Sequence, residues 1–262
     1  QAAGRLRRAA FAPSLGAMDF SKYSKKLPAG VDLTLLVVAA ICCFAIWSFV
    51  EIADDAPEGD YLSIEVEILK SLRNPENPEE PIGPRWVEEA AIDLTALGGL
   101  PVLILVTVLV CGHLLLLKRV RATLFVLAAT VGGGSITFYL KTVFARERPD
   151  AIPALAEVST FSFPSGHAMT SSLVYMTLGA LLAQANRYRR EKLYFIGVAL
   201  FLSFLIGLTR VYLGVHYPTD VMAGWAAGTA WALLCWMLAR YLVNRRVLRS
   251  ETPLPSDAPA PR

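Results

Sequence analysis

Apolar runs long enough to cross a membrane constrain this chain more than any other feature. A helix needs about 20 residues to span the hydrocarbon core, and lipid forces such a run to be helical because it offers the backbone no hydrogen-bond partner. Hydrophobic residues make up 55% of the 262 residues and charged residues only 18%, too apolar for an ordinary soluble domain. We predict an all-α membrane protein with six transmembrane helices. The predicted spans are residues 33–50, 94–117, 122–140, 165–184, 193–209 and 221–239.

An acidic segment, residues 51–93, separates the first two predicted spans and carries 13 Asp and Glu residues. A short amphipathic helix outside the membrane is predicted by the helical spacing of Ile64, Ile68 and Leu72. Four prolines between residues 75 and 84 then predict an extended turn. Trp86 begins a second helical stretch that returns to the membrane. We interpret the segment as a solvated cap, the alternative being that its negative field shapes headgroup access.

The distribution of basic residues predicts the orientation. Lys and Arg number 6 in the N-terminal segment, 3 in the loop 118–121, 4 in the loop 186–192 and 5 at the C-terminus, whereas the other side carries 7. Because positively charged loops stay on the cytoplasmic side, we predict cytoplasmic termini. The protein is then placed in the plasma (inner) membrane, with its outer face in the periplasm of a Gram-negative cell.

Three parts are predicted along the chain. Residues 1–30 form a basic cytoplasmic tail, residues 31–243 the six-span domain, and residues 244–262 a proline-rich, disordered cytoplasmic tail. Met18 is a candidate natural start, which leaves the origin of residues 1–17 open. Small residues in two spans are interpreted as close helix contacts: Gly132, Gly133, Gly134, Gly224 and Gly228.

Three polar clusters interrupt the apolar sequence between residues 141 and 220. They are Lys141 with Arg148-Pro149, then Pro164-Ser165-Gly166-His167, then Arg210 with His216 and Asp220. Charged and titratable groups at the ends of spans are costly and usually functional, and the predicted topology places all three clusters on the outer face. We interpret them as one site for a phosphate.

The first task of such a site is to neutralise the anion. Arg148 and Arg210 can each grip phosphate oxygens with two donors, and Lys141 can act as a point charge. A turn at Ser165 and Gly166, just before a helix, can point backbone amides at the same anion with help from the helix dipole. These residues make a phosphate cradle without a metal ion.

The second task is chemical. An unprotonated imidazole can attack phosphorus and a protonated one can donate to the leaving oxygen. Asp220 lies four residues after His216, and Pro218 between them is favoured in the first turn of a helix, so the carboxylate can fold back and fix the tautomer of the ring. We predict His216 as the nucleophile and His167 as the general acid.

The spacing Lys141-x6-Arg148-Pro149, Pro164-Ser165-Gly166-His167 and Arg210-x5-His216-x3-Asp220 resembles the three signature motifs of the type 2 phosphatidic acid phosphatase superfamily, in a bacterial integral-membrane form. The resemblance implies a metal-independent phosphatase that works through a phosphohistidine intermediate, with no cofactor. One departure is Thr209, where the family usually has serine. Its hydroxyl keeps a phosphate contact available, while the added methyl changes the local geometry.

The substrate predicted for such an enzyme is a membrane lipid phosphate or pyrophosphate, of the undecaprenyl pyrophosphate, phosphatidic acid or phosphatidylglycerol phosphate type. The partners are therefore this lipid and the bilayer, with no nucleic acid, and the oligomeric state stays open. Alternatives are a phosphatase of a soluble compound, a vanadate-dependent haloperoxidase and a non-enzymatic lipid transporter on the same scaffold. Beside the first motif, Arg146, Glu147 and Asp150 are interpreted as a solvated loop.

Overall fold

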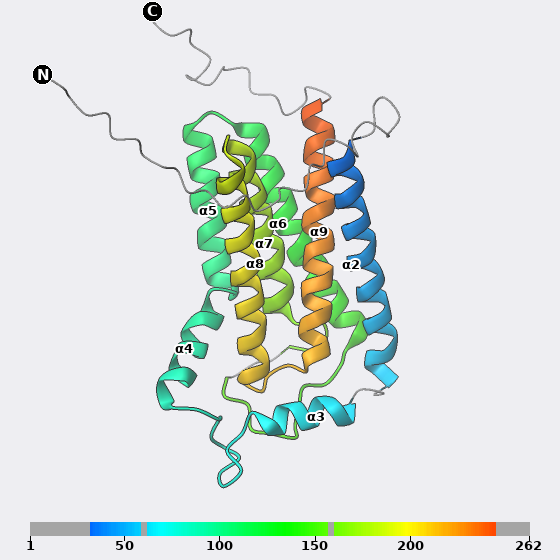
Figure 1. The fold of residues 1–262 in the computed structure, drawn as a ribbon, viewed down its shortest axis with the longest axis vertical. Coiled ribbons are helices and arrows are strands. Elements are labelled where there is room, and N and C mark those ends of the chain that lie inside the picture. The colour runs from blue at the N-terminus through cyan, green and yellow to red at the C-terminus, as the bar shows by residue number, and fades with distance from the viewer. Residues whose placement is uncertain (1–31, 59–61, 157–159, 245–262) are drawn as a thin grey trace, which may run out of the picture. The chain divides into compact units, whose positions relative to one another are not determined.

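The computed structural model describes residues 32–58, 62–156 and 160–244, and the regular secondary structure of these ranges is helical apart from one isolated β-bridge (Figure 1). Of the described residues, those from Val38 onward form one compact unit, and residues 32–37 are grouped apart from it. Most of the two predicted tails, residues 1–30 and 244–262, lies outside the described residues.

Five described helices are long and apolar enough to cross a membrane. They are α2 (Leu33–Glu58), α6 (Val120–Phe144), α7 (Gly166–Ala185), α8 (Arg189–Tyr212) and α9 (Pro218–Asn244). A sixth span is formed when α4 (Arg85–Ala96) and α5 (Leu100–Leu116) are taken together across a bend of 47°. The predicted all-α class is confirmed, and the number of candidate spans is five, or six when the bent pair is counted as one span. The second span differs from the prediction, because the chain bends at glycines 98 and 99 and α5 begins as a new helix at Leu100, with Pro101 in its first turn.

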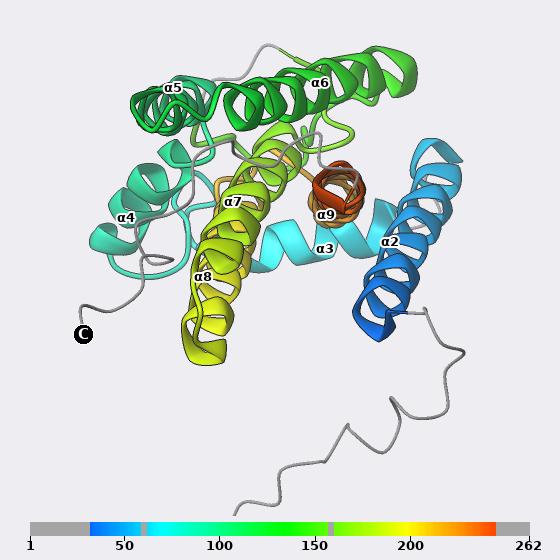
Figure 2. The same ribbon diagram turned by 90° about the horizontal axis from the view of Figure 1, so that it is seen from above.

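Helix α7 is central to the bundle and packs most extensively against α8 and α9 (Figure 2). The interpretation of Gly224 and Gly228 as contact residues is confirmed, because α9 crosses the start of α7 at backbone distance. A Cβ atom added at Gly228 would lie 2.5 Å from the carbonyl oxygen of Met169, and one at Gly224 would lie 2.8 Å from that of Ser165. On the other side of α9, Cys42 and Ala45 of α2 pack against Ala230.

The predicted extramembrane helix exists as α3 (Leu62–Ser71), which lies at the end of the bundle where α8 ends and α9 begins (Figure 1). The isoleucines whose spacing predicts this helix do not lie on its buried face. Ile64 and Ile68 are 57% and 40% exposed, whereas Leu69 and the carboxylate of Glu65 are buried. The physical reason is that Leu69 packs into an apolar cluster and Glu65 pairs with Arg146 on the side of α3 that faces the bundle. The two isoleucines therefore lie on the outward face of the helix.

The proline-rich stretch after α3 forms the predicted turn, in which the amide of Ile82 donates to the carbonyl of Leu72. It is not detached from the bundle, because Arg73 is only 3% exposed. The guanidinium of Arg73 donates from Nη1 to the carbonyl of Tyr212 at 2.9 Å and from Nη2 to that of Pro153 at 3.1 Å. The interpretation of residues 51–93 as a solvated cap is therefore wrong for Glu65 and Arg73, which tie the segment to the end of α8 and the start of α9.

Candidate active site

The three polar clusters meet at the end of the bundle next to α3. Lys141 lies in the last turn of α6, Ser165 to His167 begin α7, and Arg210 lies in the last turn of α8. His216 follows in the connection to α9, and Asp220 lies in the first turn of α9. His167 has electrostatic interactions with Arg210, His216, Lys141 and Arg148. Residues within a stretch of 80 residues, from Lys141 to Asp220, thus contribute to one site, as the sequence predicts.

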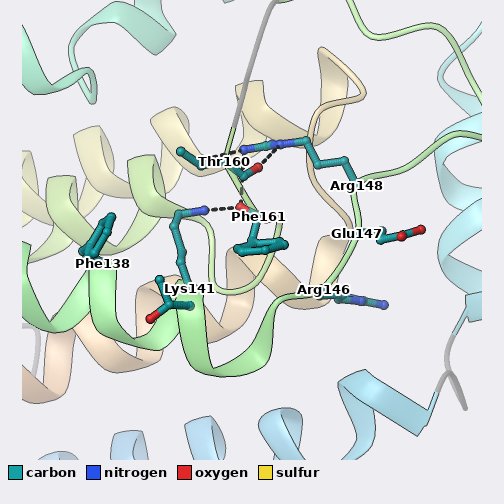
Figure 3. Close-up of a pocket in the computed structure, with 8 residues that line it drawn as sticks. Phe138, Lys141, Arg146, Glu147, Arg148, Thr160 and Phe161 are labelled. Carbon is teal, nitrogen blue, oxygen red and sulfur yellow. Dashed lines mark hydrogen bonds between the residues drawn. The ribbon is translucent and has the colours of Figure 1, made fainter.

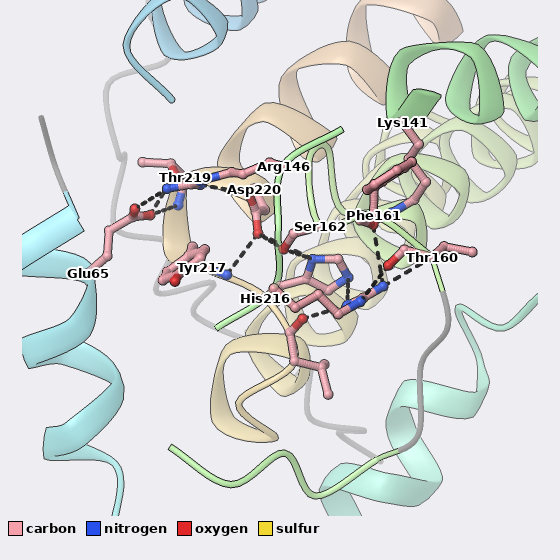
Figure 4. A network of polar contacts seen from close by, with 12 residues as sticks. Glu65, Lys141, Arg146, Thr160, Phe161, Ser162, His216, Tyr217, Thr219 and Asp220 are labelled. Carbon is pink, nitrogen blue, oxygen red and sulfur yellow. Dashed lines mark hydrogen bonds and ion pairs between the residues drawn. The ribbon is translucent and has the colours of Figure 1, made fainter. Parts of the chain in front are cut away.

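His216 lies between the carboxylate of Asp220 and the guanidinium of Arg148. Its Nδ1 atom is 3.4 Å from Oδ2 of Asp220, and its Nε2 atom is 3.2 Å from Nη1 of Arg148 (Figure 4). A guanidinium can only donate, so Nε2 accepts and the ring proton is on Nδ1, facing the carboxylate. Burial lowers the pKa of His216 to about 4, so the imidazole is neutral near pH 7. The ring therefore presents a lone pair on Nε2 toward a cation.

Two cations reach the same backbone segment. Lys141 donates from Nζ to the carbonyl of Phe161 at 2.5 Å. Arg148 donates from Nε to the carbonyl of Thr160 at 2.7 Å and from Nη1 to that of Val215 at 2.6 Å. Burial lowers the pKa of Arg148. The two positive groups are thus held by neutral oxygens, which an anionic ligand beside Nε2 can replace.

The start of α7 leaves polar groups without partners. Ser165 is the N-cap residue, but no side chain caps the helix, so its first amides have no acceptor within the helix. Oγ of Ser165 and Nε of Arg210 are also buried without a hydrogen-bond partner. Since unsatisfied buried polar atoms are costly, both groups have hydrogen-bonding capacity left for an anionic ligand. A Cβ atom at Gly166 would lie 3.2 Å from Cε of Lys141, so glycine keeps this space open.

Arg210 and Thr209 differ in what they offer. Arg210 is 2% exposed, and its Nη1 donates to Oγ1 of Thr95 on α4 at 3.1 Å. Thr209 is also buried, but its hydroxyl donates to the carbonyl of Ile206 in its own helix at 2.6 Å. That bond leaves only lone pairs free on the hydroxyl, which do not suit an anion. Arg210 thus keeps a donor, Nε, that has no partner, whereas the hydroxyl of Thr209 donates within its own helix.

The sequence missed three residues that contact Asp220 or its partners. Ser162 donates its hydroxyl to Oδ2 of Asp220, Arg146 donates from Nη1 to Oδ1 at 2.8 Å, and Glu65 pairs with Arg146. The prediction of Arg146 as a solvated residue was wrong, since its side chain is 11% exposed. Burial by itself lowers the pKa of Arg146, but the negative charges of Asp220 and Glu65 outweigh this effect. The pKa of Arg146 is therefore raised above its usual value.

A signal for Arg146 was present in the sequence. Residues 145–150 have no regular secondary structure, and side chains two apart in an extended segment face the same side. Arg146 and Arg148 therefore both point at the segment 215–220, while Glu147 between them is exposed, as predicted. No comparable local signal marks Glu65 or Ser162.

A cavity of about 510 Å³ leads to the two cations from the side of α6 (Figure 3). Its apolar walls include Phe138 and Phe161, which are 70% and 45% exposed. The polar residues of the lining are Lys141, Thr142, Arg146, Glu147, Arg148 and Thr160. Within the described ranges, no group of three His, Cys, Asp or Glu side chains is placed to hold a metal ion. The cavity combines an apolar entrance with a positively charged base.

Comparison with known proteins gives consistent matches. A model of the PAP2 superfamily matches residues 121–244, which include all three polar clusters. Phosphatidylglycerophosphatase B of Bacillus subtilis is 32% identical over 145 residues, covering 55% of this chain and 70% of that protein. Lipid A 1-phosphatase of Rhizobium etli is 32% identical over 119 residues, covering 42% of this chain and 47% of that protein.

A solved structure is also similar. The crystal structure of a transmembrane PAP2 type phosphatidylglycerolphosphate phosphatase from Bacillus subtilis matches with a TM-score of 0.69 and 26% sequence identity. The match covers 77% of this chain and 96% of that chain. The similarity thus extends beyond the polar clusters to most of the helices.

Proposed function

Because this chain belongs to the PAP2 superfamily and is a phosphatase, we propose that it hydrolyses the phosphate of a membrane lipid through a phosphohistidine formed at Nε2 of His216. The observation that carries the proposal is the neutral imidazole of His216, whose Nε2 atom faces Arg148 while Nδ1 faces Asp220. A nucleophile, an orienting carboxylate and an anion-binding cation are then in contact.

In the proposed reaction Nε2 of His216 attacks phosphorus, and the bond to the leaving oxygen breaks as His167 protonates that oxygen. His167 then takes a proton from water, whose oxygen attacks the phosphohistidine and breaks the P–N bond. The positive charge that develops on the imidazole is stabilised by Asp220. Inorganic phosphate leaves, and His216 returns to its neutral form.

Positive groups hold the phosphoryl oxygens throughout this reaction. We assign this role to Lys141, Arg148 and Arg210, together with Ser165 and the amides that begin α7 at Gly166. Since these donors are fixed by the protein, charge neutralisation does not depend on a bound metal ion. An EDTA-resistant reaction follows from this assignment.

The lipid class is supported by the cavity and by the relatives. The apolar entrance beside α6 suits a substrate whose tail remains in the bilayer, and the relatives are named as phosphatases of phosphatidylglycerophosphate and lipid A. We propose a lipid monophosphate or isoprenyl pyrophosphate as the substrate. A soluble substrate would not need this entrance, and a transporter would not need a histidine nucleophile.

A panel assay tests the proposal. Purified protein in detergent should release inorganic phosphate from phosphatidylglycerol phosphate, phosphatidic acid or undecaprenyl pyrophosphate, and the rate should persist in EDTA. Glycerol 3-phosphate and para-nitrophenyl phosphate serve as soluble comparisons and should react more slowly. Faster turnover of the soluble compounds would favour the soluble-substrate alternative, and a strict need for magnesium would contradict the mechanism.

We further propose that the site faces the outside of the plasma membrane, the periplasm in a Gram-negative cell. The basic loops 118–121 and 186–192 join α5 to α6 and α7 to α8, at the end of the bundle away from α3 and the site (Figure 1). Reporter enzymes fused after Arg121 and after Asp150 should be active in the cytoplasm and outside it, respectively. An external reporter at Arg121 would reverse the proposed orientation.

A further inference from the structure

Glu65 is a buried carboxylate on a helix that lies outside the predicted spans. It is 2% exposed, and both of its oxygens are used. Oε1 accepts from the amide of Thr219 at 3.0 Å and from its hydroxyl at 2.5 Å, while Oε2 accepts from Nη2 of Arg146 at 2.7 Å. Thr219 lies in the first turn of α9, where the helix dipole favours a negative charge. Glu65 is thereby fixed to the helix that carries Asp220.

Arg146 connects Glu65 to the proposed site. While Nη2 binds Glu65, Nη1 donates to Oδ1 of Asp220 at 2.8 Å and to Oγ1 of Thr219 at 3.0 Å (Figure 4). Its guanidinium also lies 4.3 Å above the ring centre of Tyr217. These four contacts fix the orientation of the planar guanidinium. The contact with Glu65 is one of them.

Arg146 binds one oxygen of the Asp220 carboxylate, and the other oxygen faces His216. Oδ1 is taken by Arg146, and Oδ2 accepts from the amide of Tyr217 at 2.9 Å and from the hydroxyl of Ser162. Oδ2 is also the oxygen that faces Nδ1 of His216 at 3.4 Å. Release of Arg146 would leave Oδ1 without this partner, so that the Asp220 carboxylate is held only through Oδ2 and its orientation toward the imidazole is less fixed.

Charge favours the same arrangement. Glu65, Arg146 and Asp220 together carry one net negative charge beside the neutral imidazole. Attack from Nε2 while Nδ1 keeps its proton makes the ring positive, so this net charge lowers the energy of the phosphorylated form. Without Glu65, Arg146 would cancel the charge of Asp220.

We propose that Glu65 is a positioning residue for the nucleophile His216, acting through Arg146 and Asp220. The inference rests on the proposed function, because it concerns the rate at which His216 is phosphorylated. It gives α3 a role that the three sequence motifs do not contain. The extramembrane helix becomes part of the machinery that prepares the nucleophile.

The test compares Glu65→Gln with Glu67→Gln, an exposed residue of the same helix with the same charge change. Glu65→Gln should lower kcat by about tenfold to a hundredfold and leave KM within about twofold, because substrate binding is not its role. Glu67→Gln should match the wild type in both constants. Thermal unfolding in detergent is recorded for each variant, and rates are expressed per folded protein.

A double-mutant cycle provides a second test, which does not depend on the folding of Glu65→Gln alone. Arg146→Met and the Glu65→Gln/Arg146→Met pair should have equal kcat, because Glu65 can act only when Arg146 is present. A further loss in the double variant would overturn the inference, as would wild-type kcat in Glu65→Gln or a change confined to KM. Wild-type protein without any phosphatase activity would instead refute the proposed function, and the inference with it.

Discussion

His216→Ala should reduce phosphate release by at least about 10⁴-fold, the scale of loss when a nucleophile of a triad is removed. The reason is that Nε2 of His216, which lies 3.2 Å from Nη1 of Arg148, is the atom proposed to attack phosphorus. The measurement is kcat for release of inorganic phosphate from the best lipid of the panel.

His113→Ala is the matched control for this substitution. His113 is exposed and lies on α5 near the turn into α6, at the end of the bundle away from the site. Its replacement should leave kcat unchanged. Activity of His216→Ala above about 1% of the wild type would exclude His216 as the essential nucleophile. A phosphoryl group trapped on the wild type by acid quenching should be absent from His216→Ala.

Asp220→Asn should lower kcat by about 10³ to 10⁴-fold with a small change in KM. The asparagine has nearly the same shape, so the segment after His216 keeps its fold. Its amide, however, carries no charge to stabilise the imidazolium, and an NH₂ group facing Nδ1 favours the tautomer with the proton on Nε2. That tautomer has no lone pair for attack on phosphorus.

Asp150→Asn provides the corresponding control, since Asp150 is an exposed acid in the loop that follows Arg148. It should retain wild-type kinetics. A loss smaller than about tenfold for Asp220→Asn would show that the orientation of His216 does not depend on the carboxylate. The same result would also remove the basis of the role inferred for Glu65.

The spans and the polar clusters could be predicted because each depends on a local property of the sequence. Length and lack of charge identify a span, and charged groups at the end of one are conspicuous. The buried pairing of Glu65 with Arg146 could not be predicted in this way, because its partners lie 81 residues apart. Glu65 also lies among many other acids in residues 51–93, and nothing in the sequence distinguishes it from them.

The buried face of α3 shows a second limit. Apolar periodicity identifies the core of a soluble protein because water surrounds it. At the surface of a bilayer, apolar side chains can also face lipid, so Ile64 and Ile68 gave no information about which side of α3 meets the bundle. Leu69 and Glu65 face inward because their partners, Tyr217 and Arg146, lie there.

The backbone bond from the amide of Ser165 to the carbonyl of Asp220, at 2.9 Å, has a mechanical consequence. It joins the helix that begins with the proposed phosphate cradle to the helix that carries Asp220, and Gly224 lets the two helices approach at backbone distance. A displacement of α9 would therefore disturb the binding of phosphate and the orientation of the proposed nucleophile together.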